Sequence, residues 1–130
     1  MHPLYSTAME TTDKLREVRL QVASLSMDLS QAEYNLQLMR AKVERGLIKK
    51  VKGEKALGPT VEDRARIFTL ALDADADYQG QLKRRNEVEL KLEQAKAELA
   101  SLRDKLSVLL VAMKATDEPV NTYSKGSEAA

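Results

Sequence analysis

The chain has 130 residues, of which 4% are aromatic and 32% are charged, and it contains neither tryptophan nor cysteine. A core of Leu, Val, Ala and Met favours helices packed on helices, and the lack of cysteine excludes disulfides and cysteine-based zinc sites. The net charge is +1, but nine basic and four acidic residues lie between Arg40 and Arg66. No apolar run of 18 residues and no signal-peptide pattern occurs, so we expect a soluble, cytoplasmic protein.

Residues 13–45 carry an apolar residue at alternating steps of three and four. This repeat, sustained for about four heptads, is typical of a helix that packs one face, here called the first seam, against a partner helix. Thr7 or Thr12 can cap the start of this helix, and Gly46 can cap its end. The first seam comprises Leu15, Val18, Val22, Leu25, Leu29, Ala32, Leu36, Met39 and Val43.

A second seam predicts one long helix over residues 61–114, for which Thr60 is the expected N-cap. An alternative breaks this helix at residues 78–81 and gives three helices, because Gly80 costs about 1 kcal/mol relative to alanine inside a helix. The second seam comprises Ile67, Ala71, Ala74, Tyr78, Gln81, Arg85, Val88, Leu92, Ala95, Leu99, Leu102, Leu106, Leu109 and Met113.

With a basic connection at 46–60, the two helices predict an all-α fold, an antiparallel coiled-coil helical hairpin. An N-terminal segment at 1–12 and a flexible tail at 115–130 would flank the hairpin. At ~1.5 Å per residue the second helix would be about 80 Å long and the first about 50 Å. Four leucines of the second seam would therefore lack a partner unless residues 7–12 are also helical.

Leu20, Met27 and Tyr34 recur every seven residues, about 170° around the helix from the first seam. A helix that is apolar on two opposite faces is seldom completed by one partner, so we expect a homodimer of hairpins in a four-helix bundle. Alternatively, single apolar side chains are tolerated on a surface. The candidate oligomer interface comprises Leu20, Met27, Tyr34, Leu99, Leu102, Leu106 and Leu109.

Residues 73–80 read DADADYQG and suggest a calcium-binding loop. Such a loop needs glycine at position 6 and a bidentate glutamate at position 12, but counting from Asp73 these positions hold Tyr78 and Arg84. We therefore interpret the three aspartates as exposed residues of the second helix. No metal site is expected.

The other candidate chemistry also fails on spacing. GEKALGPT, residues 53–60, approaches a phosphate-binding loop, but Pro59 stands where the lysine is required. The single histidine, His2, has no partner for nucleophilic catalysis nearby in the sequence. The sequence therefore predicts no catalytic residue and no cofactor, and we expect a protein that is not an enzyme.

The connection RGLIKKVKGEK, residues 45–55, contains five basic residues and one acidic residue. Basic side chains at the tip of a hairpin can contact phosphates without reading sequence, although no aromatic side chain lies between them for base stacking. The alternative is a lysine-rich loop that only keeps the protein soluble. The candidate residues for contact with an anion or nucleic acid are Arg45, Lys49, Lys50, Lys52 and Lys55.

GEKALGPTVEDRARIFTLALDADADYQ (53–79) and AELASLRDKLSVL (97–109) resemble small coiled-coil proteins encoded in phage and prophage genomes. The resemblance covers about residues 45–113 and implies an accessory role near phage DNA metabolism, with no catalytic residue to transfer. The sequence thus predicts a self-associating interaction module, with a nucleic-acid-binding protein or a protein-binding holdase or inhibitor as alternatives.

Overall fold

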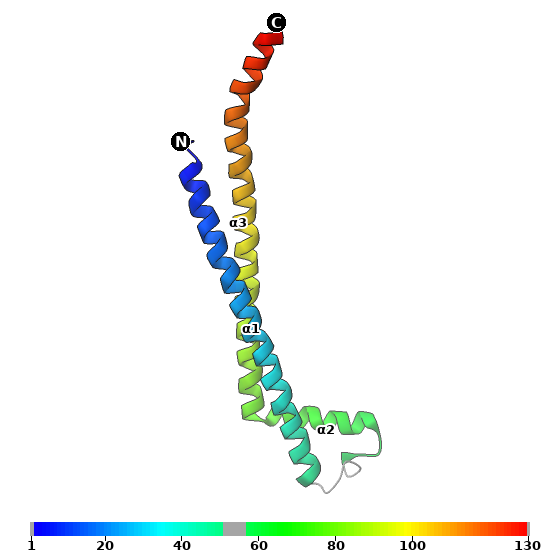
Figure 1. Cartoon of the computed structure of the whole chain (residues 1–130). Helices are drawn as coiled ribbons and strands as arrows, with labels where there is room; N and C mark the ends of the chain where they lie inside the picture. Colours follow the sequence, from blue (N-terminus) through cyan, green and yellow to red (C-terminus); the bar gives the residue numbers. More distant parts are fainter. Residues whose placement is uncertain (1, 51–56, 130) are drawn as a thin grey trace. The chain divides into compact units, whose positions relative to one another are not determined.

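A computed structural model describes residues 2–50 and 57–129, with side chains as far as Ala115. This part of the chain contains three α-helices and no strand: α1 (Tyr5–Lys50), α2 (Val61–Ala74) and α3 (Ala76–Ala129) (Figure 1). The all-α prediction is confirmed. The chain divides into two compact units, residues 1–23 with 93–130 and residues 24–92, and each is described by itself.

Helix α1 is longer at both ends than the predicted 13–45. At its start, His2 accepts hydrogen bonds from two backbone N–H groups, that of Leu4 at Nδ1 and that of Tyr5 at its carbonyl oxygen, both at 3.0 Å. Thr12 is not a cap, because its hydroxyl donates to the carbonyl of Ala8 inside the helix. Gly46 also lies inside α1, and the predicted C-cap is wrong because a glycine penalty of about 1 kcal/mol does not by itself end a helix.

In the first unit, the first seam of α1 packs against the second seam of α3. Leu15, Val18 and Leu99 form a buried cluster in which Val18 is only 1% exposed. Leu102 and Leu106 pack against this cluster, because α1 begins at Tyr5 and so extends far enough to cover them. Residues 7–12 are thus helical, which is the condition under which these leucines were expected to find a partner within the chain.

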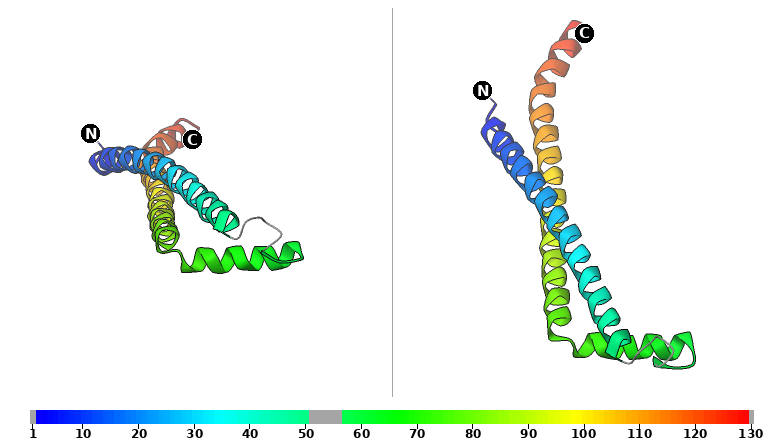
Figure 2. Two further views of the ribbon diagram at one scale, coloured as in Figure 1. Left: turned by 90° about the horizontal axis from the view of Figure 1, so that it is seen from below. Right: turned by 60° about the horizontal axis from the view of Figure 1, so that its bottom comes forward.

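In the second unit, the predicted helix 61–114 is divided at Asp75. The predicted cap at Thr60 is confirmed, since its hydroxyl oxygen accepts from the backbone N–H of Asp63 at 3.1 Å. Asp75 itself has an extended backbone, with φ −83° and ψ 113°, and ends α2. Figure 2 shows that α2 and the first turns of α3 run in different directions. The break lies five residues before Gly80, which is inside α3.

Two side chains satisfy the backbone groups left free at this break. Asp75 Oδ1 accepts a hydrogen bond of 2.8 Å from the backbone N–H of Tyr78, so Asp75 is the N-cap of α3. From the first turn of α3, Gln79 Nε2 donates at 3.0 Å to the carbonyl of Leu72 at the end of α2. The interpretation of DADADYQG as three helical acids is thus wrong for its central aspartate, whose backbone ends α2 and whose carboxylate caps α3.

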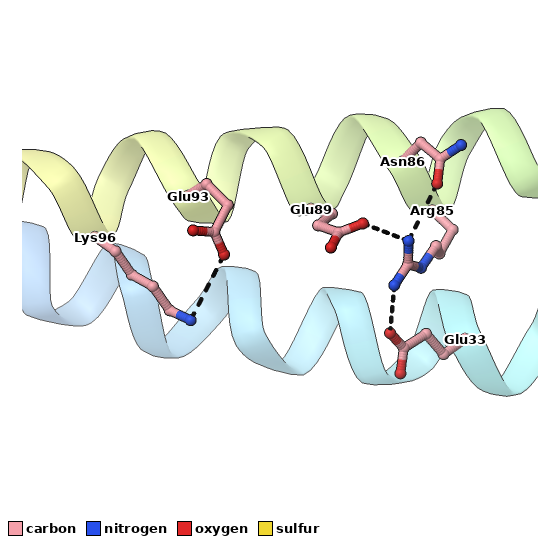
Figure 3. A network of polar contacts seen from close by, with 6 residues as sticks. All are labelled: Glu33, Arg85, Asn86, Glu89, Glu93 and Lys96. Atoms are coloured by element: carbon pink, nitrogen blue, oxygen red, sulfur yellow. Dashed lines mark hydrogen bonds and ion pairs between the residues drawn. The ribbon is translucent and has the colours of Figure 1, made fainter.

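The first seam is also confirmed in the second unit, where Ala32 is 4% exposed and the other seam residues of α1 are half-buried. Arg85, which interrupts the second seam, is accommodated by an ion pair: its Nη2 lies 3.1 Å from Glu33 Oε1 of α1 (Figure 3). The same guanidinium also bonds Glu89 and Asn86 of α3. A cation can therefore occupy a seam position because carboxylates surround its head group.

Helix α3 continues to Ala129, and the flexibility expected of residues 115–130 stays a prediction. The apolar repeat stops at Met113, but the backbone hydrogen bonds of a helix do not require a seam. Before α2, Gly58 has φ 142°, a conformation that favours glycine, and it precedes Pro59 and the cap Thr60 as expected for a tight connection.

Candidate interaction surfaces

The outer face of α1, opposite the first seam, exposes large apolar side chains. In the second unit Met27 is 73% exposed and Tyr34 57% exposed, and in the first unit Leu20 is 68% exposed. Leu38, which the sequence analysis did not select, is 52% exposed in the second unit. A hollow of about 410 Å³ beside Met27 is otherwise lined by Ser26, Ser30 and Gln31. The α1 residues of the predicted oligomer interface are therefore available to a partner.

Most of the α3 residues predicted for the same interface lie in or against the core of the first unit. Leu99 is 8% exposed and belongs to the core of the first unit, and Leu102 and Leu106 are partly buried against that core. Leu109 is half-buried. Since Leu99, Leu102 and Leu106 pack in a core shared with α1 of the same chain, the exposed part of the candidate interface is the outer face of α1.

The basic end of α1 comprises Arg45, Lys49 and Lys50, all of which are exposed. Within the described residues none of the three makes an ion pair or a side-chain hydrogen bond. Arg45 and Lys49, together with Gly46 and Ile48, line a hollow of about 410 Å³. Positive charge in the last turn of a helix is favourable because the helix dipole is negative there. The other two candidate residues, Lys52 and Lys55, lie outside the described residues.

The positive charge of Arg40, which precedes this basic end, is neutralised by a carboxylate. Its Nε donates to Glu44 Oε1 at 3.0 Å, and this hydrogen bond, with the charge of the carboxylate, raises the pKa of Arg40 above its ordinary value. Arg40 therefore adds no uncompensated positive charge to the basic end of α1.

A hollow of about 380 Å³ in the second unit lies where α1 meets the junction of α2 and α3. Its lining has two lysines from α1, two aspartates from the junction, and a mainly apolar remainder. The opposite charges balance, so this hollow has no preference for an anion or a cation. The sequence pattern does not predict that these residues share a hollow, because it predicts no break at Asp75. The lining residues are Met39, Lys42, Val43, Gly46, Leu47, Lys50, Ala71, Asp75 and Asp77.

Two further findings concern the described residues only. They contain no group of three or more His, Cys, Asp or Glu side chains placed to hold a metal ion. None of their helices combines the length and the apolarity that crossing a membrane requires. Comparison of the chain with protein-family models, with curated proteins and with solved structures gives no match.

Proposed function

We propose that this chain is a non-enzymatic interaction module, an antiparallel coiled-coil hairpin that self-associates through the outer face of α1. The observation that carries the proposal is the exposure of Met27 and Tyr34 on the side of α1 opposite the first seam. Complete burial of a side chain of this size stabilises an assembly by about 1.5–3 kcal/mol. In a symmetric dimer both copies of each side chain are buried, so each residue contributes this free energy twice. A four-helix bundle is the simplest assembly that covers this face.

The order of contacts in the second unit supports an antiparallel arrangement. Toward the end of α1, Leu47 and Val43 share a hollow with Ala71, which comes early in the second seam, and with Asp75. Earlier in α1, Glu33 pairs with the later residue Arg85. As residue numbers rise along α1, the numbers of the partner residues fall, which is the pattern of a hairpin.

Sedimentation at tens of micromolar tests this proposal. We expect the unchanged chain to be a dimer and the double variant Met27→Glu, Tyr34→Glu to be a monomer with unchanged helicity. The matched control adds the same two charges on other exposed faces of α1, as Gln21→Glu with Gln37→Glu, and should remain a dimer. A monomeric unchanged chain, or a dimer that survives the Met27 and Tyr34 changes, would refute the proposal.

The role we propose for this module is that of a cytoplasmic phage accessory protein. Its support is the sequence resemblance at residues 53–79 and 97–109. Affinity capture from infected and uninfected host cells tests this role. We expect phage-encoded proteins or phage DNA to be enriched from the infected cells. Recovery of the same host proteins from infected and uninfected cells would contradict the proposed role.

A second candidate function is nucleic-acid binding by the basic end of α1. It is favoured by Arg45, Lys49 and Lys50, which are exposed and have no acidic partner within the described residues. Phosphate contacts make affinity fall with salt concentration, so a salt titration with DNA or RNA measures them. The double variant Lys49→Glu, Lys50→Glu should make the affinity fall less steeply with salt concentration. The control variant Lys91→Glu, Lys105→Glu, which changes two lysines that are also exposed, should leave this dependence unchanged. Binding that is independent of salt would contradict this function.

A further inference from the structure

A groove of about 420 Å³ in the first unit is lined by arginine. The arginines are Arg16 and Arg19 of α1 and Arg103 of α3, and all three are exposed. Its apolar part is formed by Leu15, which is 4% exposed, and by the partly buried Leu106. The groove therefore has a fixed apolar floor in the core and three cationic side chains around it; the remaining lining residues are Thr12 and Ser107.

These three arginines have no carboxylate partner within the described residues, as is also true of Arg45 and Arg84 but not of Arg40 and Arg85. Arg40 is paired with Glu44 and Arg85 with Glu89, each four residues further along its helix. Arg19 and Arg103 have no acidic residue three or four positions away, where a helix would bring one into contact. Within the described residues, Arg16, Arg19 and Arg103 make no ion pair and no side-chain hydrogen bond.

The acidic residues closest in sequence do not neutralise the groove. Glu17 follows Arg16, Asp104 follows Arg103 and Asp13 precedes Arg16 by three positions, but none of these acids lines the groove. None of them pairs with a groove arginine in the described part of the chain, where Glu17 instead pairs with Lys14 at 3.8 Å. Three like charges at one groove repel each other, and this repulsion is relieved when an anion binds between them.

We propose that this groove binds a phosphate-bearing anion with at least two negative charges, such as a diphosphate or a phosphate monoester. The planar guanidinium presents paired N–H donors that match the oxygens of a phosphate, so three of them can hold several oxygens at once. The Ser107 hydroxyl, which has no hydrogen bond within the described residues, can add a donor. Thr12 cannot do so in its present rotamer, because its hydroxyl already donates to Ala8.

The number of arginines favours such a polyvalent group over the backbone of a nucleic acid. Each phosphodiester carries one negative charge and lies several ångströms from the next, so a chain of them would spread its charge along a surface. A groove of about 420 Å³ with three cations instead concentrates positive charge in one place. The proposal is independent of the proposed function, since it involves neither the outer apolar residues Met27 and Tyr34 nor the basic end of α1.

Isothermal titration calorimetry with sodium pyrophosphate, in a phosphate-free buffer at constant ionic strength, tests the groove. The full chain should bind one pyrophosphate per groove. Because a hydrogen bond to a charged group is worth about 1.5–3 kcal/mol, each of Arg16→Gln, Arg19→Gln and Arg103→Gln should weaken binding by about tenfold or more. Arg103→Lys keeps the positive charge but loses the paired N–H donors. Its affinity for pyrophosphate should therefore lie between that of Arg103→Gln and that of the unchanged chain.

Arg84→Gln is the matched control, because Arg84 is exposed on α3 and does not line the groove. It should leave the affinity unchanged, and circular dichroism should show that every variant keeps its helicity. Absence of saturable binding at millimolar pyrophosphate, or equal losses in Arg84→Gln and Arg103→Gln, would overturn the proposal. So would tighter binding of an oligothymidylate without terminal phosphates that depends on the same three arginines, because the groove would then recognise a phosphodiester chain.

Discussion

Replacing Asp75 by alanine removes the side-chain oxygen that begins α3. The structure gives this oxygen one hydrogen bond to the chain, 2.8 Å from the backbone nitrogen of Tyr78. Loss of an N-cap of this kind costs about 1 kcal/mol, within a range of about 0.5–2 kcal/mol. The bond from the backbone N–H of Gln79 to the carbonyl of Asp75, 3.0 Å long, does not involve the side chain and should remain. We therefore expect Asp75→Ala to lower the free energy of unfolding by about 1 kcal/mol.

Urea unfolding followed by circular dichroism at fixed protein concentration measures this change as a lower midpoint with an unchanged slope. Asp75→Asn is the conservative variant, and it should lose only a few tenths of a kcal/mol because asparagine caps about as well as aspartate. Asp73→Ala is the matched control, since Asp73 is exposed in the last turn of α2 and caps no helix. If Asp75→Ala were as stable as the unchanged chain, the hydrogen bond from Tyr78 would contribute nothing to stability, contrary to this prediction.

Three further predictions concern stability and can be measured by the same urea titration. Gly46→Ala and Gly80→Ala should each stabilise the chain by about 0.5–1 kcal/mol, because both glycines lie inside helices and a Cβ there meets nothing within 4 Å. Gly58→Ala should destabilise it by about 1 kcal/mol or more, because φ is +142° and the new Cβ would lie 2.8 Å from a side-chain atom of α2. A double-mutant cycle of Glu33→Gln and Arg85→Gln should give a coupling of about 0.5 kcal/mol, as expected for a partly exposed ion pair; zero coupling would mean that the contact adds no stability.

Periodicity predicted the faces of the helices well. Every residue of the first seam is buried or half-buried, and Leu20, Met27 and Tyr34 on the opposite face are exposed. This part was predictable because burial on a long helix depends on angular position, which the sequence spacing determines directly. The Thr60 cap was predictable for a similar reason, since the capping oxygen accepts from a backbone N–H three residues further on.

The ends of α1 and the position of the break in the second helix were not predicted, since the three-helix alternative placed the break at residues 78–81. Glycine was given too much weight: α1 passes through Gly46 and α3 through Gly80, where a helical glycine costs only about 1 kcal/mol. The break at Asp75 carries no proline or glycine, and the apolar repeat continues across it. The available signal was the capacity of an aspartate to cap, supported here by Gln79, whose bond to Leu72 joins residues seven apart and has no local sequence signature.

The arginine groove was also missed, because its residues are separated by more than eighty positions in the chain. A scan for basic clusters along the sequence selects residues 45–55 and passes over Arg16, Arg19 and Arg103. A better criterion is the residue three or four positions away on the same helix. An arginine with no acidic residue at those positions has no ion-pair partner within its own helix. Applied to both helices, this test would have identified Arg19 and Arg103 before their proximity to one groove was known.

The pair between Arg85 and Glu33 also has a consequence for how the helices can align. A seam made only of Leu, Val, Ala and Met would pack almost as well after sliding by one heptad. Sliding by seven residues would place Arg85 beside Ser26 or Arg40 in place of Glu33. One alternative leaves the guanidinium without a carboxylate, and the other sets two cations against each other. A single charged residue in an apolar seam thus selects one register from several, as polar residues at seam positions do in coiled coils.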